Sequence, residues 1–261
     1  MGTGDHIEHR DHITGFKEEI TKAASSRDGF FTWFNSAKDA DAAFVRGGWD
    51  FMFHVGLPIT PYLSAPEDKT VLEIGHGGGR ILQAACRCFK AGIGIDIHEK
   101  NALVEEELHR QGVTNVTLHQ STDGSLVVGD AAVDLVYSFI VLPHVERMAI
   151  LLNYLSETAR VLKPGGLAVL YFGRYTRFSH NQRSATLYWL DRFLENMLMP
   201  HGYRELPAKV NEYNLLVTLP CAKREAKRRG LWPLRTLVSR KNVPDGVRRY
   251  GSQHGLLLQK V

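Results

Sequence analysis

Residues Val71-Leu72-Glu73-Ile74-Gly75-His76-Gly77-Gly78-Gly79-Arg80 form an apolar strand that runs directly into a glycine loop. The pattern of residues 81–89 predicts a helix that begins where the glycines end. Glycine adopts backbone angles that are closed to other residues, and it lets a ligand come close to the main chain. The N-terminus of the following helix offers free N–H groups and a positive dipole end. The stretch therefore predicts a ligand-binding loop.

A single acid supports this interpretation and narrows the ligand. Asp96 stands in Gly94-Ile95-Asp96-Ile97, at the end of the next apolar run, about 20 residues after the loop, where an acid can bind ribose hydroxyls. A dinucleotide site requires glycine where Arg80 stands, and Glu73 would repel a pyrophosphate. A sulfonium ligand with a free ammonium group is compatible with Glu73. The pattern indicates a nucleoside ligand that is not a dinucleotide.

Outward from the loop, short apolar strands alternate with helices. We expect helices over 81–89, 99–111 and 146–162, a sharp break at 163–166, and strands over 70–74, 91–97, 115–119, 133–138 and 167–172. Such alternation predicts a parallel sheet with helices on both faces. The strands are nearly continuous runs of Val, Ile and Leu, as is typical of strands that are buried on both faces.

Two flanking regions complete the chain. Helices are expected over 13–24, after Ser36 (including 40–45) and over 49–55, so we expect residues 1–66 to form an N-terminal helical cap and residues 67–261 the main domain. Within that domain, residues 173–212 are an insertion expected to form part of a substrate pocket. The remaining expected elements are a helix at 185–198, a strand at 213–219, a basic helix at 220–229, strands at 234–239 and 255–261, and a turn at 242–251.

Composition excludes several classes of protein. The chain has 261 residues, of which 44% are hydrophobic and 23% charged, as in an ordinary globular protein. No apolar run is long enough to span a membrane and the N-terminus has no signal peptide, so a cytoplasmic protein is expected. The three cysteines lack zinc-site spacing, and no metal is expected. Residues 221–249 hold ten Lys or Arg against two acids, which keeps an anionic substrate or nucleic acid possible.

The motifs resemble those of class I S-adenosylmethionine-dependent methyltransferases. The first motif of that family, E/D-x-G-x-G-x-G, matches residues 73–79, and the family's second-strand acid matches Asp96. Residues 115–124 look like the segment that flanks the adenine, while 133–145 and 159–166 look like the next two motifs. The chain departs from the family at Gln120-Ser121, where Gly-Asp is common, and at His76 and Pro143.

The resemblance implies a three-layer α/β/α Rossmann-like methyltransferase fold. Its sheet would be mostly parallel and seven-stranded, with an antiparallel C-terminal strand and an N-terminal helical cap. S-adenosylmethionine would be the methyl donor and S-adenosylhomocysteine the product. The positions that match the family's cofactor contacts are Glu73, Gly75, His76, Gly77, Gly79, Asp96, Ile97, Asp123, Gly124, Ser138 and Phe139.

The acceptor site is expected outside the motif core, between the cap and the insertion. The catalytic candidates are His144, His180 and Tyr175, and the candidates for substrate contact are Arg174, Trp49 and His54. The resemblance favours a small-molecule or glycan acceptor methylated on a hydroxyl oxygen by in-line displacement. Two alternatives stay open: an RNA methyltransferase that uses the basic C-terminal segment, and a non-catalytic module that binds S-adenosylmethionine.

Overall fold

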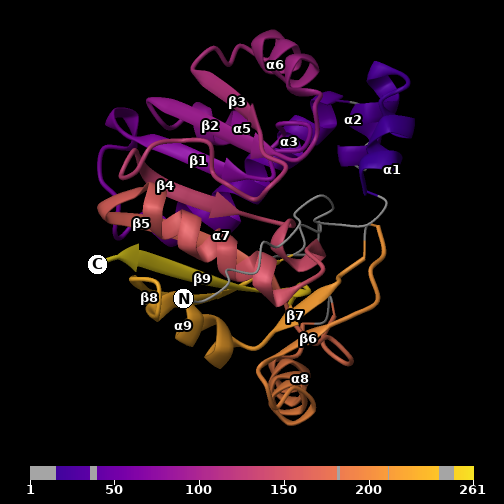
Figure 1. The fold of residues 1–261 in the computed structure, drawn as a ribbon, viewed down its shortest axis with the longest axis vertical. Coiled ribbons are helices and arrows are strands. Elements are labelled where there is room, and N and C mark those ends of the chain that lie inside the picture. The colour runs from indigo at the N-terminus through magenta and orange to yellow at the C-terminus, as the bar shows by residue number, and fades with distance from the viewer. Residues whose placement is uncertain (1–15, 36–39, 181–182, 211, 241–249) are drawn as a thin grey trace, which may run out of the picture.

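The computed structural model describes residues 16–35, 40–180, 183–210, 212–240 and 250–261 (Figure 1). Its sheet has nine strands where seven were predicted: seven follow in the order β3-β2-β1-β4-β5-β9-β8, and two short strands join at the end of β5. Because β9 pairs antiparallel with both β5 and β8, six of the seven strands run in one direction and the C-terminal strand opposes them. The predicted α/β fold is therefore confirmed. The strands are Thr70–Ile74 (β1), Ala91–Asp96 (β2), Val116–Gln120 (β3), Val133–Ser138 (β4), Leu162–Gly173 (β5), Leu231–Val238 (β8) and Gln253–Lys260 (β9).

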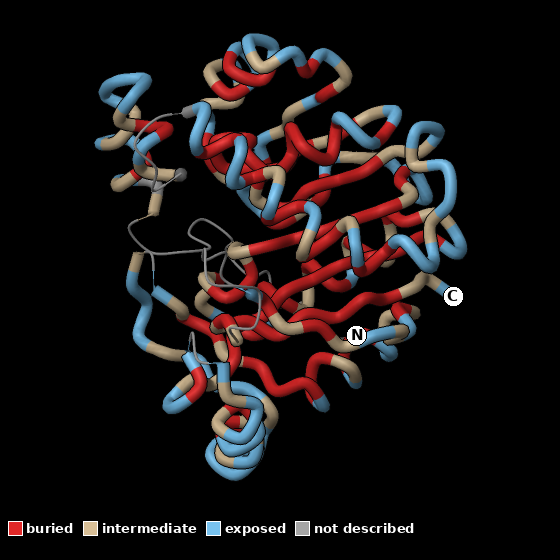
Figure 2. Tube along the Cα trace, turned by 180° about the vertical axis from the view of Figure 1, so that it is seen from behind, coloured by how far each residue is buried: buried red, intermediate tan, exposed pale blue. Residues whose placement is uncertain are grey.

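The central strands are buried on both faces, and their side chains alternate between two cores. Leu167, Val169 and Tyr171 of β5 pack on one face, and Ala168, Leu170 and Phe172 on the other. This alternation follows from the two-residue repeat of a strand. Helices α7 (Met148–Val161) and α9 (Leu219–Lys227) cover one face, and α3 (Ala40–Phe51) and α5 (Leu82–Cys86) help to cover the other. Figure 2 shows the buried strands running through the middle of the molecule.

The N-terminal helices pack on the glycine-loop side of the sheet. Helices α1 (Phe16–Ala23) and α2 (Arg27–Asn35) share a core with α5 and α6 (Asn101–Arg110). The aromatic residues 30–34 form part of α2, for which no helix was predicted. The two short helices expected over 40–45 and 49–55 are one helix, α3, followed by a π-helical turn at Met52–Gly56 and α4 at Leu57–Ile59. Gly47 is needed there, because a Cβ on it would lie 1.8 Å from the Arg80 carbonyl oxygen.

The later segments follow the prediction in part. The break expected at 163–166 lies inside β5: the strand pairs with β4 at Leu162 and next at Leu167, the register shifts between these pairs, and Gly165 has a φ of 77°. A short strand that was not predicted, β6 (Tyr203–Glu205), pairs with β7 (Leu215–Val217), and β7 pairs in parallel with Gly173 at the end of β5. Helix α8 (Ala185–Leu198) precedes this hairpin and forms the lower end of the molecule in Figure 1. Most of the turn expected at 242–251 lies outside the described residues.

Candidate active site

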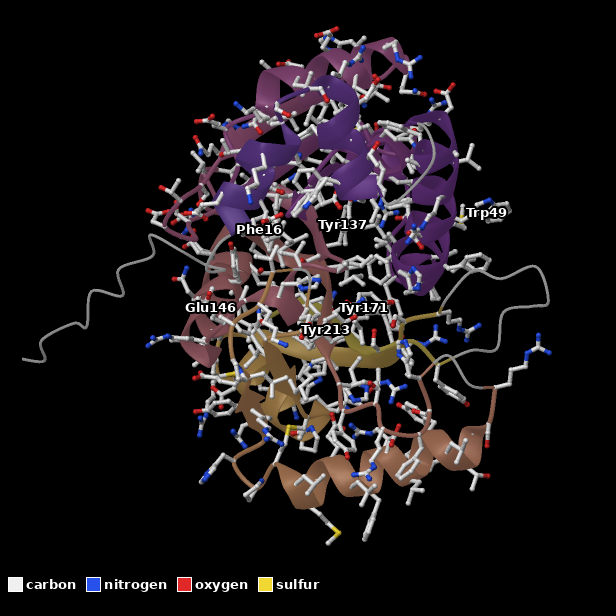
Figure 3. The ribbon with its side chains drawn as sticks, turned by 90° about the vertical axis from the view of Figure 1, so that its right-hand side faces the viewer. Phe16, Trp49, Tyr137, Glu146, Tyr171 and Tyr213 are labelled. Atoms are coloured by element: carbon white, nitrogen blue, oxygen red, sulfur yellow. The ribbon has the colours of Figure 1, made fainter. Side chains whose placement is uncertain are left out.

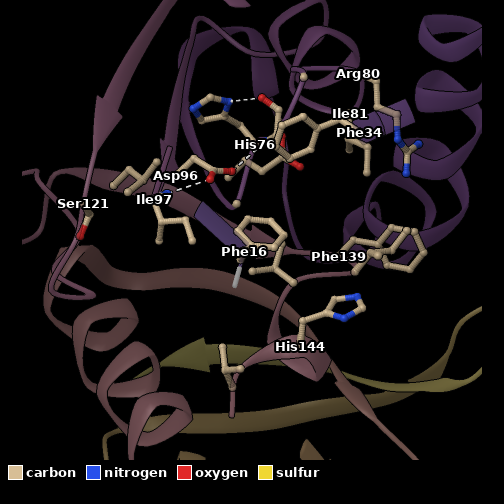
Figure 4. A pocket seen from close by; sticks show the side chains of 18 of the residues that line it. Phe16, Phe34, His76, Arg80, Ile81, Asp96, Ile97, Ser121, Phe139 and His144 are labelled. Carbon is tan, nitrogen blue, oxygen red and sulfur yellow. Dashed lines mark hydrogen bonds between the residues drawn. The ribbon is translucent and has the colours of Figure 1, made fainter. Parts of the chain in front are cut away.

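A cavity of about 510 Å³ opens where β1, β2 and β4 end, a size usual for small-molecule sites. Open α/β sheets bind their ligands at this carboxyl edge. Figure 4 shows the Asp96 side of the cavity and, across from it, Phe139 and His144. The lining residues are Phe16, Trp33, Phe34, Glu73, Gly75, His76, Gly77, Gly78, Arg80, Ile81, Ile95, Asp96, Ile97, Ser121, Phe139, Ile140, Val141, His144, Val145, Tyr154 and Tyr213.

The glycine loop borders the cavity with a backbone that other residues would strain. Gly75 and Gly77 have positive φ angles of 79° and 52°. A Cβ on Gly75 would lie 2.2 Å from Val141, and one on Gly77 would lie 2.7 Å from Phe34. Both facing residues line the cavity, so a larger residue in the loop would push into ligand space. Gly79 has a different role, because its Cα faces Val104 and Leu108 of α6 and it does not line the cavity.

Asp96 is held in place by the backbone around it. One carboxylate oxygen accepts the Gly77 N–H at 2.8 Å, and the other accepts the N–H groups of Ile97 at 2.7 Å and His98 at 3.3 Å. Burial by itself would raise the pKa of Asp96, but His98, His76 and these N–H groups outweigh it and lower the pKa. An ionised carboxylate has about four acceptor positions. Asp96 therefore keeps capacity for ribose hydroxyls.

Two histidine side chains, His76 and His98, hold the glycine loop through hydrogen bonds to its backbone. His76 Nδ1 and His98 Nε2 lie 3.0 and 3.1 Å from the Gly77 carbonyl oxygen, which can only accept, so both donate to it. Burial lowers the pKa of His76 to about 4. His76, Asp96 and His98 are the group within the described ranges whose side chains could hold a metal ion, with ligand atoms within 4.8 Å of one another. The histidine nitrogens that face Gly77 carry protons and so have no lone pair for a metal ion. We therefore interpret the two histidines as residues that hold the loop in place and not as metal ligands.

Glu73 is a buried carboxyl at the other end of the loop. Only 2% of its surface is exposed, and it accepts a hydrogen bond of 3.0 Å from the Tyr137 hydroxyl. Burial raises its pKa to about 8, against the opposing effects of Tyr137 and Arg80. Arg80 lines the same part of the cavity and donates to Asp50 of α3 at 2.5 Å. An ammonium group beside Glu73 would find a carboxyl that can become its counter-ion.

Of the three catalytic candidates, only His144 lines the cavity. Its Nδ1 donates to the Glu212 carbonyl oxygen at 2.6 Å, and its ring lies edge-on to Tyr213 with centroids 5.4 Å apart. Because Nδ1 carries the proton, Nε2 of the neutral ring holds a lone pair, and the described residues supply no partner for it. Burial lowers the pKa of His144, which keeps the ring neutral near pH 7. Tyr175 is half-buried and His180 is exposed, and neither lines the cavity.

The three candidates for substrate contact lie away from the cavity. Trp49 is 55% exposed on α3 and stacks on Phe53. His54 lies behind Phe139, which lines the cavity, and the two rings stack with centroids 4.1 Å apart. The Nδ1 atom of His54 donates to the Asp50 carbonyl oxygen, and its Nε2 atom accepts the Arg240 N–H. Both nitrogens are therefore occupied, and His54 supports Phe139 without facing the ligand space.

Arg174 is a buried structural cation and does not face the cavity. Its guanidinium donates to the carbonyl oxygens of Gly251 and Tyr175 and lies 3.9 Å from Asp191. These contacts join the end of β5 to α8 and to the segment that leads into β9. Sequence position placed Arg174 correctly at the carboxyl edge, but its side chain turns into the protein.

Besides Gly79, three of the predicted cofactor residues do not line the cavity. The Ser138 hydroxyl is fully buried and donates to the Ile74 carbonyl oxygen, joining β4 to β1. Asp123 is exposed and accepts from the Ser125 N–H and hydroxyl, and Gly124 is buried beside it. Ser121, which donates to Asp123, lines the cavity in their place. Because Ser121 directly follows the third strand, its place in the sequence could have predicted that it lies at this edge of the sheet.

An aromatic wall from the N-terminal helices closes the opposite side. Phe16 of α1 lies edge-on to Trp33 and Phe34 of α2, at centroid distances of 5.1 and 6.5 Å. Trp33 and Phe34 belong to the cap segment in which an acceptor pocket was expected, whereas Phe16, Tyr154 and Tyr213 were not predicted. Only packing of the helices against the sheet brings these rings to the cavity.

The basic segment forms internal ion pairs. Arg224, Arg228 and Arg229 of α9 and its C-terminal turn all pair with Glu225, at 3.0, 2.9 and 3.1 Å. Lys227 lies over the Trp232 ring at 4.2 Å. None of these residues lines the cavity. Within the described residues, no helix is long and apolar enough to cross a bilayer.

Comparison with known proteins relates these features to methyltransferases. A family model described as a methyltransferase domain matches residues 72–170. The chain is 36% identical over 169 residues to a ubiquinone biosynthesis O-methyltransferase of Paramagnetospirillum magneticum, covering 62% of this chain and 65% of that protein. It is 25% identical over 186 residues to a demethylmenaquinone methyltransferase of Tropheryma whipplei, covering 70% and 68%.

A solved structure has the same fold. It is a SAM-dependent methyltransferase from Methanosarcina mazei, with a TM-score of 0.56 and 20% identity over 78% of this chain and 97% of that one. The segment matched by the family model begins within β1 and ends within β5, so it contains the glycine loop, Asp96 and the end of β4. Residues 72–170 thus form a methyltransferase domain, the chain has the fold of S-adenosylmethionine-dependent methyltransferases, and S-adenosylmethionine is its methyl donor.

Proposed function

We propose that the protein methylates a hydroxyl oxygen of a small aromatic acceptor, with His144 as the general base. The observation that carries this proposal is the orientation of His144. Its Nδ1 is fixed by the Glu212 carbonyl oxygen, which leaves the Nε2 lone pair without a partner among the described residues, on a side chain that lines the cavity. A lowered pKa keeps this ring in the basic form near neutral pH.

The residues around the loop fit the donor. Asp96 would hold the ribose hydroxyls, Ile97 would lie against the adenine, and Glu73 would bind the amino end of the methionine part. The bound sulfonium supplies an activated methyl group. The protein then has to align the acceptor oxygen with the S–CH₃ bond and exclude water. His144 would take the hydroxyl proton on Nε2 as the oxygen bonds to the methyl carbon and the C–S bond breaks.

The aromatic wall supports a planar apolar acceptor over a glycan. Phe16, Trp33 and Phe34 face the cavity from the cap, and Phe139 and Tyr213 from the main domain. Flat rings stack well on such walls. Two of the related proteins are named for ubiquinone biosynthesis and for demethylmenaquinone, and ubiquinone and demethylmenaquinone are both quinones. We therefore place the acceptor among phenols and hydroquinones, a narrower class than the small molecules and glycans expected from sequence.

The test combines product analysis with a matched pair of variants. The protein is incubated with S-adenosylmethionine and a catechol or hydroquinone, and the methylated position is determined by NMR. In His144→Asn, the amide N–H can still donate to the Glu212 carbonyl oxygen, but the base is gone. We expect turnover to fall about 10²- to 10⁴-fold. In Tyr213→Phe the ring that faces His144 is kept, and we expect only a small change.

Two outcomes would contradict the proposal. A methyl group on carbon or nitrogen would show that the acceptor atom is not oxygen. Undiminished turnover by His144→Asn on a hydroxyl acceptor would show that His144 is not the base. Calorimetric binding of S-adenosylhomocysteine to each variant serves as the control for an intact donor site.

A further inference from the structure

Ile140 has a backbone conformation that β-branched residues rarely adopt. Its φ angle is 70°, in the left-handed region, where the branched side chain is crowded by its own backbone. The residue stands two positions after the end of β4, and its side chain lines the cavity beside Phe139. Such a conformation persists only where surrounding contacts hold it, and it occurs mostly at functional sites. A contact from elsewhere in the chain must therefore hold Ile140.

This contact comes from Gln253, the first residue of β9 and 113 residues away along the chain. The side-chain oxygen of Gln253 accepts the Ile140 N–H at 3.3 Å. Its own backbone is fixed, because its N–H and its carbonyl oxygen both bond to Ser239, at 3.1 and 3.0 Å. Only 4% of Gln253 is exposed. The amide therefore offers Ile140 an acceptor at one place in the interior of the protein.

The same amide reaches the segment that orients the proposed base. Because the backbone N–H of Ile140 can only donate, the Gln253 oxygen faces Ile140, and the NH₂ group is left to donate to the Tyr213 hydroxyl. Burial raises the pKa of Tyr213, and hydrogen bonds that include one from Gln253 oppose that rise. Tyr213, near the middle of the molecule in Figure 3, directly follows Glu212, whose carbonyl oxygen accepts the His144 proton.

The two segments that Gln253 contacts are bonded to each other. Asn214 is fully buried and donates its backbone N–H to the Pro143 carbonyl oxygen at 2.9 Å. Its side-chain amide donates to the His144 carbonyl oxygen at 2.8 Å. The base is therefore fixed within one hydrogen-bonded unit, and Gln253 bonds to a residue in each of its two segments.

This unit borders the donor loop. Val141 packs so closely on Gly75 that a Cβ there would lie 2.2 Å from it. The direction in which the chain leaves β4 at Ile140 thus decides where Phe139 and His144 lie relative to the donor. Methyl transfer requires the acceptor oxygen to lie in line with the S–CH₃ bond, and a misplacement of about 1 Å costs about 100-fold in rate.

We propose that Gln253 is a positioning residue for methyl transfer: it holds Ile140 in the left-handed conformation and so sets the place of His144 relative to the donor. The inference rests on the proposed function, in which His144 is the base. Gln253 does not line the cavity, so it acts through Ile140 and not by contact with the donor or the acceptor.

The test is a double-mutant cycle read out in turnover. Gln253→Met keeps the length of the side chain and removes its hydrogen bonds, so kcat should fall about 10- to 100-fold. The KM for the acceptor and the calorimetric affinity for S-adenosylhomocysteine should change less than about threefold, because Gln253 contacts neither ligand.

Ile140→Gly should rescue the loss, because glycine adopts a φ of 70° freely and needs no contact to hold it. In that background Gln253→Met should lower kcat less than about threefold. Ile140→Ala is the matched control: it also shortens the side chain in the cavity, but it keeps the penalty for the left-handed conformation. In the alanine background the loss should stay at about tenfold or more.

Gln83→Met is the control for loss of a buried amide elsewhere. Gln83 is 5% exposed, donates to the Phe44 carbonyl oxygen and does not line the cavity, so the melting temperature should fall while kcat stays the same. Equal losses of kcat from Gln253→Met in the glycine and alanine backgrounds would overturn the proposal. So would a kcat for Gln253→Met equal to that of the unaltered protein.

A second readout needs no acceptor. Exchange of the Ile140 N–H with solvent, followed by NMR, should be about tenfold faster in Gln253→Met. Unchanged exchange would overturn the proposal whether or not a phenol is methylated. Failure of the proposed function is seen separately, as a methyl group on carbon or nitrogen or as undiminished turnover by His144→Asn.

Discussion

Glu73 makes donor binding depend on pH in a way that the structure lets us calculate. Its pKa in the free protein is raised to about 8 from an ordinary value of 4.5, mainly by burial. To act as counter-ion to an ammonium group it must be ionised. With a pKa of about 8, roughly 1% of the free protein has the carboxylate at pH 6 and about half at pH 8. The α-amino group of the donor has an ordinary pKa of about 7.7–8.0, so about 0.4 of the free donor is still the ammonium form at pH 8. Affinity for S-adenosylmethionine should therefore rise about twentyfold between these pH values.

Calorimetry measures both sides of this linkage. Titrations at pH 7 in buffers of different ionisation enthalpy should show a net release of about 0.8 proton per bound donor, because about 0.9 proton leaves Glu73 and about 0.1 is taken up by the amino group of the donor. Glu73→Gln should bind weakly with no rise from pH 6 to pH 8. Tyr137→Phe removes a hydrogen bond that lowers the pKa of Glu73, so its rise in affinity should begin at higher pH.

The same shift affects stability in the opposite direction. The raised pKa means that the folded, donor-free protein binds this proton more tightly than the unfolded chain does. This contribution of Glu73 to the free energy of unfolding is complete below about pH 4.5 and is lost as pH rises toward about 8.

A constant affinity for the donor between pH 6 and pH 8, or an equal rise in Glu73→Gln, would refute the assignment of Glu73 to the amino end of the donor.

Three further substitutions test the site. Asp96→Ala should weaken donor binding about 10²- to 10⁴-fold in calorimetry, since two charged hydrogen bonds at about 1.5–3 kcal/mol each are lost; unchanged affinity would exclude the ribose contact. Gly77→Ala places a Cβ 2.7 Å from Phe34 at a φ of 52°, so the melting temperature and donor affinity should both fall, and a normal melting curve would contradict the strain. Trp49→Ala should change the KM for the acceptor less than twofold, because Trp49 is exposed and does not line the cavity. A large rise in KM would show that Trp49 contacts the acceptor.

Much of the fold follows from local pattern. Alternating runs of β-branched and aliphatic residues define β1 to β4, and the glycines at 75–79 permit backbone angles that place the loop at the strand end. Asp96 could be assigned from spacing alone, because a strand of known length ends at a known edge. The irregularity predicted at 163–166 is found within β5, because β5 pairs with β4 at Leu162 and next at Leu167, where its pairing with β9 also begins.

The side chains around the acceptor site depend on contacts between distant parts of the chain. The proton of His144 is positioned by the Glu212 carbonyl oxygen, 68 residues away, and no periodicity encodes that contact. Arg174 and His54 were reasonable candidates by position, yet each finds partners inside the protein and turns from the cavity.

Helix α8 shows the same division most clearly. Its repeat of apolar residues is visible in the sequence and would ordinarily predict a buried apolar face. The structure buries the other face, since Asp191 and Glu195 have partners in a preceding loop and in β9. The strands β1 to β4, the glycine loop and the position of Asp96 at the end of β2 could be predicted from the sequence, because they depend on neighbours along the chain. Only the tertiary structure decided which side chains reach the cavity and which face solvent, because burial is a property of the whole packed molecule.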